Sequence, residues 1–256
     1  MASHVLQSHP RATGLAEETV KSHQADCEIV LHGGWFCPFT QKCWVALEER
    51  GIPYKYVETN PFNKDPALLA LNPKGLIPAL TYQGKPLHDS HVILEFLEDA
   101  YPQHKPQLRP TDPYNAAQAR IWVDVINKYI VPGYFRIFHA QTPELQAAAM
   151  SEWLKYLQCF ADKIRGPYFF GEEFSIVDLS LTPWIIRDWI LVENRGFNRE
   201  NVSPKFAAYC QLIVNRPNVL KTFSNKECYE AIYALHLSGQ MKSSILEAIK
   251  SGRPLP

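Results

Sequence analysis

The chain has 256 residues, of which 46% are hydrophobic, so it can bury the core of one large domain or of two modest ones. Basic and acidic side chains number 26 each, so no overall electric field favours nucleic acid or an anionic membrane. No stretch approaches the roughly 18 apolar residues that span a bilayer, and the N-terminus lacks the apolar core of a signal peptide. We therefore predict a cytoplasmic protein that binds neither nucleic acid nor membrane.

In chain order, the first segment is a polar stretch rich in Ser and His and without sustained periodicity, which predicts a flexible N-terminal arm over residues 1–26. Residues 27–103 then alternate between strand-like and helix-like patterns. The expected elements are a strand at 29–32, a helix at 38–50, a strand at 54–58, a short helix at 65–71, strands at 76–80 and after the turn 83–85, and a helix from Ser90. A βαβ unit followed by ββα is the order of a thioredoxin-like sheet.

Three prolines in the stretch QHKPQLRPTDP then indicate a linker, which we place at 104–113. Beyond it the apolar residues recur at spacings of three and four, so residues 114–256 are predicted to be an all-helical domain, with a break near Arg216-Pro217. Ser175 and Asp178 match a helix capping box and are assigned to folding rather than catalysis. The predicted fold class is α/β plus all-α, with an N-terminal thioredoxin-like domain and a C-terminal helical-bundle domain.

The stretch WFCPFTQKC, residues 35–43, carries the strongest chemical signal. If Pro38 occupies the first turn of a helix, its fixed φ and missing N–H suit that position, and Cys37 becomes the helix N-cap. A sulfur atom there faces unpaired backbone N–H groups and the positive end of the helix dipole, which both lower the pKa of a thiol. We predict that Cys37 is an activated nucleophile rather than a small buried residue.

The rest of the motif and the other cysteines indicate which thiol would regenerate Cys37 after it has reacted. A dithiol redox protein would carry its resolving cysteine at Thr40, so an external thiol must complete any redox cycle. Cys43 lies well round the helix from Cys37 and is predicted to be an inward-facing packing residue. The six cysteines form no C-x-x-C pair and show no zinc-finger spacing with histidine, so we expect free thiols and no metal.

With these residues the sequence resembles the glutathione transferase superfamily, and its Cys37-Pro38-Phe39 motif with an N-terminal extension looks most like the omega class. Three further segments match in order, namely Leu76-Ile77-Pro78, Asp89-Ser90 and Ser175-x-x-Asp178. The resemblance implies the glutathione transferase fold, glutathione as co-substrate, and a homodimer.

The resemblance also implies a glutathione site, made of Phe39, Lys64, Ile77, Pro78, Asp89 and Ser90. In the family, the proline of the Ile-Pro segment is held in cis, which lets the preceding residue pair with the cysteinyl part of glutathione. Ser90 at a helix N-terminus would hold the γ-glutamyl carboxylate, and Asp89 its ammonium group. Lys64 would hold the glycyl carboxylate, and the backbone of Phe39 would lie near the ligand.

A second substrate is expected between the two domains, where apolar side chains meet the reactive sulfur. Arg187 matches an arginine of the omega electrophile pocket, whereas Tyr229 stands where members of that class often carry tryptophan. The candidate residues of this pocket are Trp35, Tyr129, Tyr134, Trp184, Arg187 and Tyr229.

The predicted function is that of a glutathione-dependent thiol transferase or reductase, in which Cys37 attacks a mixed disulfide or a glutathionyl adduct. Reduction of dehydroascorbate fits the same cysteine. One alternative is a tailoring or detoxifying transferase that conjugates, dehydrates or isomerises a small electrophile.

A second alternative is a non-catalytic glutathione-binding regulator. A third is a membrane-inserting relative, because the chloride intracellular channel family resembles the omega class and shares the Cys-Pro-Phe motif. Charged residues at Glu48, Glu49 and Arg50 make bilayer insertion of the helix after the motif costly.

Overall fold

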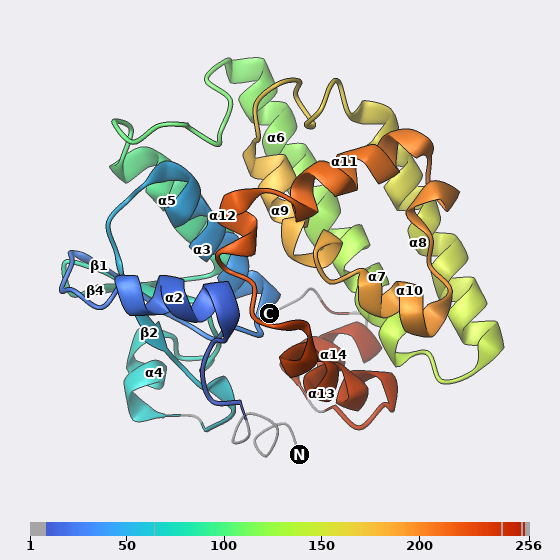
Figure 1. Cartoon of the computed structure of the whole chain (residues 1–256), viewed down its shortest axis with the longest axis horizontal. Helices are drawn as coiled ribbons and strands as arrows, with labels where there is room; N and C mark the ends of the chain where they lie inside the picture. Colours follow the sequence, from blue (N-terminus) through green and yellow to red (C-terminus); the bar gives the residue numbers. More distant parts are fainter. Residues whose placement is uncertain (1–8, 64, 242, 252, 254–256) are drawn as a thin grey trace. The chain divides into compact units, whose positions relative to one another are not determined.

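The computed structural model describes residues 9–63, 65–241, 243–251 and 253. The chain divides into two compact units. Within the described residues, the sheet unit comprises the chain up to Leu108 together with Arg216–Tyr229, and the helical unit comprises Arg109–Asn215 and the residues from Glu230 onward. Figure 1 shows the elements of both units with the labels used below.

The sheet unit contains a four-stranded sheet with the strand order β2-β1-β3-β4. The central strand β1 pairs in parallel with β2 and antiparallel with β3, and β3 pairs antiparallel with β4. The strands are β1 (Ile29–Gly33), β2 (Lys55–Glu58), β3 (Ala79–Tyr82) and β4 (Lys85–His88). This mixed sheet confirms the predicted βαβ unit followed by ββα, which is the thioredoxin-like arrangement.

Helices cover both faces of this sheet, with α3 and α5 on one side and α4 on the other (Figure 1). They are α3 (Pro38–Arg50), α4 (Pro66–Leu71) and α5 (Ser90–Ala100), and a short 3-10 turn spans Pro61–Asn63. Each helix begins one residue after a Cys or Asp that serves as its N-cap, and α3 and α4 have proline in their first turn, as helix-start preferences predict.

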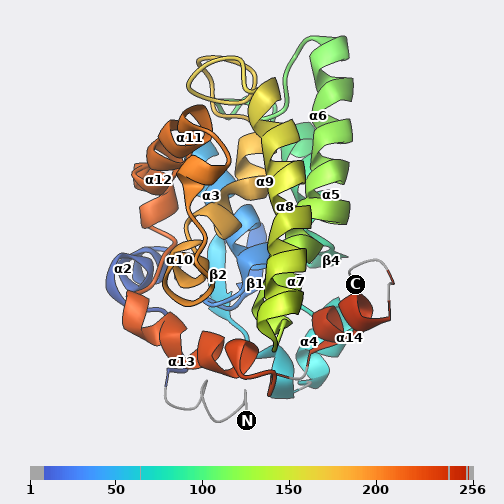
Figure 2. The ribbon, with the colours of Figure 1, turned by 90° about the vertical axis from the view of Figure 1, so that its right-hand side faces the viewer.

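The helical unit contains no strand among its described residues, as predicted. A nearly continuous rod is formed by α6 (Pro113–Val125), a π-helical segment (Ile126–Ile130) and α7 (Val131–His139), and α8 (Pro143–Lys163) packs along α7 (Figure 2). The remaining elements are α9 (Ile176–Ile185), α10 (Trp189–Arg195), a 3-10 turn (Arg199–Asn201), α11 (Pro204–Val214) and α14 (Ser244–Lys250). Helix α13 (Lys226–Leu237) begins in the sheet unit and continues into the helical unit.

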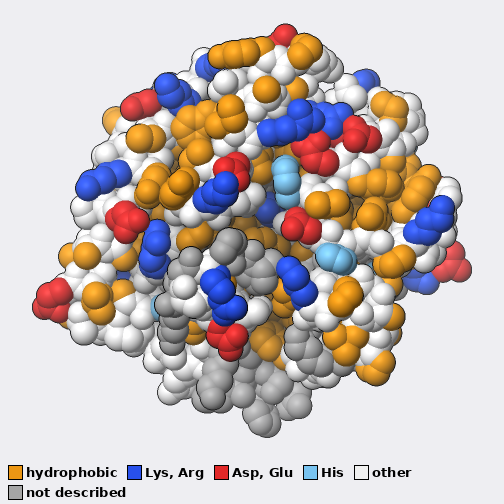
Figure 3. Space-filling model, turned by 180° about the vertical axis from the view of Figure 1, so that it is seen from behind, with side chains coloured by type: hydrophobic (Ala, Val, Ile, Leu, Met, Phe, Trp, Pro, Cys, Tyr) orange, Lys and Arg blue, Asp and Glu red, His pale blue; other side chains and the backbone are white. Residues whose placement is uncertain are grey.

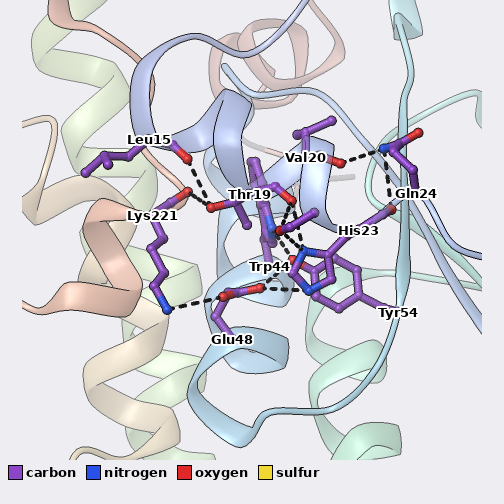
Figure 4. Close-up of polar contacts among 10 residues, drawn as sticks. Leu15, Thr19, Val20, His23, Gln24, Trp44, Glu48, Tyr54 and Lys221 are labelled. Carbon is purple, nitrogen blue, oxygen red and sulfur yellow. Dashed lines mark hydrogen bonds and ion pairs between the residues drawn. The ribbon is translucent and has the colours of Figure 1, made fainter.

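The prediction of a flexible arm is wrong for the described part of the N-terminal segment, because α2 (Gly14–Ser22) is a helix within the sheet unit. The Thr19 hydroxyl donates to the carbonyl of Lys221 at 2.8 Å, and the His23 ring stacks on Tyr54 with centroids 4.0 Å apart. The Glu48 carboxylate joins these contacts by accepting from the Tyr54 hydroxyl at 2.6 Å (Figure 4). Contacts distant in sequence stabilise a stretch whose composition alone indicated disorder.

Two other boundaries differ from the prediction. Strand β3 begins at Ala79 rather than at residue 76, because Pro78 has no N–H to donate to a sheet ladder. Residues 216–229, predicted as part of the second domain, belong to the sheet unit. The Arg216 guanidinium binds both oxygens of Glu49 on α3, at 2.6 and 2.8 Å, and the short helix α12 (Pro217–Leu220) packs against α3.

Among the described residues, no helix is long and apolar enough to cross a membrane.

Candidate functional site

Helix α3 begins as the sequence predicts, with Cys37 at the N-cap and Pro38 in the first turn. Cys37 has an extended backbone, with φ −83° and ψ 117°, and its amide donates to the carbonyl of Gly34 at 2.9 Å in a tight turn. Cys37 is a buried residue, with 8% of its surface exposed. An N-cap sulfur is close to the amides of the first helical turn, which is where a thiolate is stabilised.

The loop before Cys37 is held against α3 by a close approach at Gly33, the last residue of β1. A β-carbon at that position would lie 2.2 Å from the Thr40 methyl group, so glycine allows the strand end and the helix to meet. Thr40 is fully buried beneath this contact.

Cys37 and the Ile77-Pro78 segment are brought together. The Cys37 Sγ lies 3.7 Å from the carbonyl oxygen of Ile77, and the Ile77-Pro78 peptide bond is cis, as the resemblance implied. Cys37 and Ile77 belong to a small apolar cluster with Leu68 and Ala79. Three partly buried side chains pack against this cluster, namely Phe36, Phe39 and Leu71. The backbone of Ile77 is thus next to the sulfur, which is the position that pairing with a cysteinyl peptide requires.

The Asp89-Ser90 pair forms the start of α5. Asp89 is the N-cap, and its carboxylate accepts from the amides of His91 at 2.8 Å and Val92 at 3.4 Å. Its φ of +76° is rare for a non-glycine residue, and such backbone strain is common near ligand sites. Ser90 is the first helical residue and is 8% exposed. Helices α3 and α5 pack together, so the two helix starts belong to one part of the sheet unit.

Cys43 is a packing residue, as predicted. It is fully buried, and its thiol donates to the carbonyl of Ser90 at 3.6 Å. Burial raises the pKa of the Cys43 thiol far above that of a free cysteine, so this residue is neutral and unreactive. The contact ties the middle of α3 to the start of α5.

Sequence reasoning missed Lys42, a lysine that is only 1% exposed. Its ammonium nitrogen lies 5.3 Å from the centroid of the Phe39 ring, a cation–π distance. Burial lowers the pKa of Lys42, and the charges of Cys43, Asp89 and Cys37 oppose that fall. A lysine on an otherwise mixed helix gives no pattern that predicts burial, so only the three-dimensional structure reveals it.

The structure describes five of the six residues implied for glutathione. Phe39, Ile77 and Pro78 lie beside Cys37, and Asp89 and Ser90 lie at the start of the helix that packs on α3. Lys64 lies outside the described residues. The ligand contacts of all six residues remain predictions.

The predicted second-substrate residues are placed in separate groups. In the sheet unit, the Tyr229 hydroxyl donates to the carbonyl of Trp35 at 3.1 Å, and the two rings meet edge to face. In the helical unit, the Tyr134 hydroxyl donates to the carbonyl of Arg187 at 3.0 Å. Five of the six side chains are at most 2% exposed in the free chain, namely Trp35, Tyr134, Trp184, Arg187 and Tyr229.

The sixth candidate, Tyr129, is 41% exposed and stacks on Tyr156 with ring centroids 4.9 Å apart. It lies on the π-helical segment between α6 and α7. Whether any of these six aromatic or basic side chains contacts a substrate stays a prediction.

Asp178 has the structural role assigned to it. It is fully buried at the start of α9, and its Oδ2 accepts from the amide of Ser175 at 2.8 Å and from the Ser175 hydroxyl at 2.6 Å. Its Oδ1 accepts from the amide of Phe169 at 2.8 Å and from the Tyr209 hydroxyl at 2.9 Å. These four bonds use the acceptor capacity of the carboxylate within the fold.

No group of three or more His, Cys, Asp or Glu side chains is placed to hold a metal ion among the described residues. Figure 3 shows acidic and basic side chains interspersed over one face of the molecule, which agrees with equal totals of 26 basic and 26 acidic residues.

Comparison with known proteins gives consistent matches. A profile of the glutathione S-transferase N-terminal domain matches residues 36–100, which include the α3 and α5 starts. Among curated protein sequences, the probable glutathione S-transferase parC of Nicotiana tabacum is 32% identical over 204 residues, covering 79% of this chain and 92% of the tobacco protein. A second probable glutathione S-transferase of Nicotiana tabacum is 34% identical over 206 residues, covering 79% and 92%.

Solved structures agree. The crystal structure of glutathione transferase Omega 3C from Trametes versicolor superposes with a TM-score of 0.86 at 48% identity, covering 91% of this chain and all of that one. Rice GST1 (OsGSTU1), solved in complex with glutathione, superposes with a TM-score of 0.77 at 29% identity, covering 85% of this chain and all of the rice chain. The sequence identities, their coverage and the matching fold show that this chain belongs to the glutathione S-transferase family.

Proposed function

We propose that the protein is an omega-like, glutathione-dependent thiol transferase that uses Cys37 as its nucleophile. The Cys37 thiolate attacks the glutathionyl sulfur of a mixed disulfide, the bond between that sulfur and the acceptor sulfur breaks, and the acceptor leaves as a thiolate that takes up a proton. A glutathione thiolate then attacks the Cys37-glutathione disulfide, which releases Cys37 and oxidised glutathione. Reduction of dehydroascorbate uses the same cysteine.

The observation that carries this proposal is a cysteine at the start of α3, with its sulfur 3.7 Å from the carbonyl of Ile77. A serine or tyrosine at this position would donate a hydrogen bond to the glutathione thiolate and favour conjugation. A Cys37 thiolate would instead repel that second anion. The omega assignment is further supported by the 48% identity to the Trametes versicolor Omega 3C structure.

Glutathione binding is proposed at the residues around Cys37. Main-chain groups of Ile77 would pair with the cysteinyl part, and the α5 start would hold the γ-glutamyl end, with Ser90 on the carboxylate and Asp89 on the ammonium group. The rice structure in complex with glutathione supports this class of ligand.

Conjugation of a small electrophile is the second candidate, since the tobacco relatives at 32% and 34% identity are named probable glutathione S-transferases without an omega label. The two reactions make opposite demands on residue 37. A thiol transferase needs a cysteine there, whereas conjugation needs only a hydrogen-bond donor to the glutathione thiolate.

Replacing Cys37 with Ser tests the proposal directly. The variant should lose exchange with a glutathione mixed disulfide by at least about a hundredfold, because serine is a far weaker nucleophile at neutral pH. Mass spectrometry of the wild type after reaction should find glutathione disulfide-bonded to Cys37. A Cys43→Ser variant is the matched control, since that thiol is buried on the same helix and should be dispensable. Exchange retained by Cys37→Ser would reject the mechanism, and a gain in conjugation would support the two-reaction distinction.

A cytoplasmic location and a homodimer also remain proposals. Analytical ultracentrifugation of the full chain would measure the dimer directly.

A further inference from the structure

Residues 9–13, which we call the N-terminal strap, lie against the loop that leads into α3. The His9 carbonyl accepts from the indole nitrogen of Trp35 at 3.1 Å. Three residues on, the Ala12 amide donates to Oε1 of Glu58 at 2.7 Å, and Ala12 is 3% exposed. The strap therefore contacts both a residue of the loop that carries the nucleophile and the last residue of β2.

The far end of the strap is fixed independently of Glu58. The Thr13 amide donates to the Ser224 hydroxyl at 3.1 Å, and the Asn225 amide donates to the Thr13 hydroxyl at 3.0 Å. The Cys228 sulfur lies 3.5 Å from the same hydroxyl. Loss of the Glu58 contact would therefore release the part of the strap that lies on the loop and leave its junction with α2 in place.

Glu58 is positioned to join the strap to the loop. It pairs in register with Gly33 across the parallel strands, so it stands where the loop begins. Its carboxylate accepts a hydrogen bond from the Ala12 amide of the strap at 2.7 Å, and the backbone amide of Trp35 in the loop also favours the ionised form of Glu58 and opposes the rise in its pKa. One side chain thus bridges two segments that are more than 20 residues apart and share no strand or helix.

The titratable and charged groups that act on Glu58 are Arg11 of the strap and Tyr56 of β2. Burial raises the pKa of Glu58 to about 7, against the two amide donors and the Arg11 charge, which favour the carboxylate. Because burial outweighs the amide donors and the Arg11 charge, the folded chain with its strap in place favours the neutral form of Glu58. The contact of the strap with Glu58 should therefore weaken as the carboxylate forms.

We propose that Glu58 is a positioning residue for Cys37, because its carboxylate ties the N-terminal strap to the loop between β1 and α3 and so fixes where the helix and its N-cap sulfur begin. The inference rests on the proposed role of Cys37 as the reacting thiol. Glu58 itself takes no part in bond making or breaking.

The test measures alkylation of Cys37 by iodoacetamide from pH 5.5 to 8.5 in the full chain, following the Cys37 peptide by mass spectrometry. The wild type should show an inflection near pH 7 in addition to that of the thiol itself. Glu58→Gln, which stays neutral, should lack this inflection, and Glu58→Ala, which removes the acceptor of the Ala12 amide, should slow alkylation at pH 6 roughly fivefold, the effect of losing one hydrogen bond. Glu28→Gln is the matched control, because that carboxylate accepts hydrogen bonds from side chains near the other end of β1.

Amide hydrogen exchange of residues 9–13 provides the second measurement, corrected for the intrinsic effect of pH. Protection of the strap should fall as the pH rises through 7 in the wild type and stay level in Glu58→Gln. If the Glu58 variants do not fold, Ala12→Pro removes the amide donor, and it should lower strap protection and slow Cys37 alkylation at pH 6 to the same extent. A Glu58→Gln or Ala12→Pro profile that superimposes on the wild type, or strap protection that rises with pH, would overturn the proposal.

Failure of this inference is distinguishable from failure of the proposed function. Alkylation of Cys37 requires no glutathione turnover. A wild-type alkylation profile without the additional inflection near pH 7 would therefore refute the role of Glu58 and leave the thiol transferase mechanism standing. Retained exchange in Cys37→Ser would refute the mechanism without changing the alkylation profile.

Discussion

Helices α9 and α3 both begin at a residue type that sequence preferences place at helix starts, but the two starts are completed in different ways. At α9, in the helical unit, the Asp178 carboxylate accepts four hydrogen bonds, all from groups of the same unit. Burial raises the pKa of Asp178, and these hydrogen bonds oppose the rise. A carboxylate occupied in this way has no capacity left for a ligand.

At α3, in the sheet unit, the N-cap is a thiol whose sulfur lies 3.7 Å from a carbonyl oxygen. Sulfur is a weak donor and a weak acceptor, so it does not occupy the first-turn amides as a carboxylate does. We therefore expect the start of α9, which a carboxylate and a hydroxyl complete, to contribute to folding. We expect the start of α3, where a cysteine is the N-cap, to contribute to the reaction. The predictions below test this difference.

The largest expected effect is on folding, from Asp178→Ala. This change leaves four donors in a fully buried place, so the free energy of unfolding should fall by about 3–5 kcal/mol, measured by urea denaturation. Cys37→Ser, as the control, should change it by less than about 1 kcal/mol. Near-normal stability of Asp178→Ala together with a loss of glutathione exchange would show that the α9 start is functional and would break the comparison.

Acid should also destabilise the helical unit. His236 lies in a partly buried pair with His139, with Nδ1 of His236 and Nε2 of His139 3.3 Å apart. Burial and the neighbouring histidine lower the pKa of His236 to about 3. An unfolded histidine takes up its proton near pH 6.5, so the unfolded chain binds more protons between these values. The contribution of His236 should therefore lower the free energy of unfolding by about 1.4 kcal/mol per pH unit as the pH drops below about 6.5.

Urea denaturation at pH 7, 6 and 5 measures that slope. His236→Phe cannot titrate, and its ring suits a site that contacts Phe135 and Phe138, so it should be less sensitive to acid than the wild type. His88→Gln, at an exposed position on β4, is the control and should keep the wild-type slope. Equal slopes in wild type and His236→Phe would refute the prediction.

Local sequence signals account for the parts of the fold that could be predicted. The α3 start was predictable because Cys37 and Pro38 are adjacent and proline has few acceptable helical positions. The same holds for the α9 capping box, whose two side chains are three residues apart. Each signal lies within one helical turn, where spacing in sequence fixes spacing in the structure.

The parts that could not be predicted depend on contacts between distant residues. Helix α2 is stabilised by bonds such as that of Thr19 to Lys221, 202 residues away, which no local pattern reveals. The assignment of residues 216–229 to the sheet unit depends in the same way on the ion pair of Arg216 with Glu49. The burial of Lys42 and the partial burial of Glu58 could not be predicted either, because charged residues are normally exposed.

The smallest expected effect concerns the α5 start, where the comparison predicts a site open to a ligand. Ser90→Ala should weaken glutathione binding about tenfold, the value of one hydrogen bond to a charged group, as measured by isothermal titration calorimetry. Ser175→Ala, at the start of α9, is the matched control: it should lower the free energy of unfolding by about 1 kcal/mol and leave glutathione affinity unchanged. If Ser90→Ala bound glutathione normally and lost stability instead, the α5 start would resemble that of α9. The ligand would then depend on Cys37 and Ile77 alone.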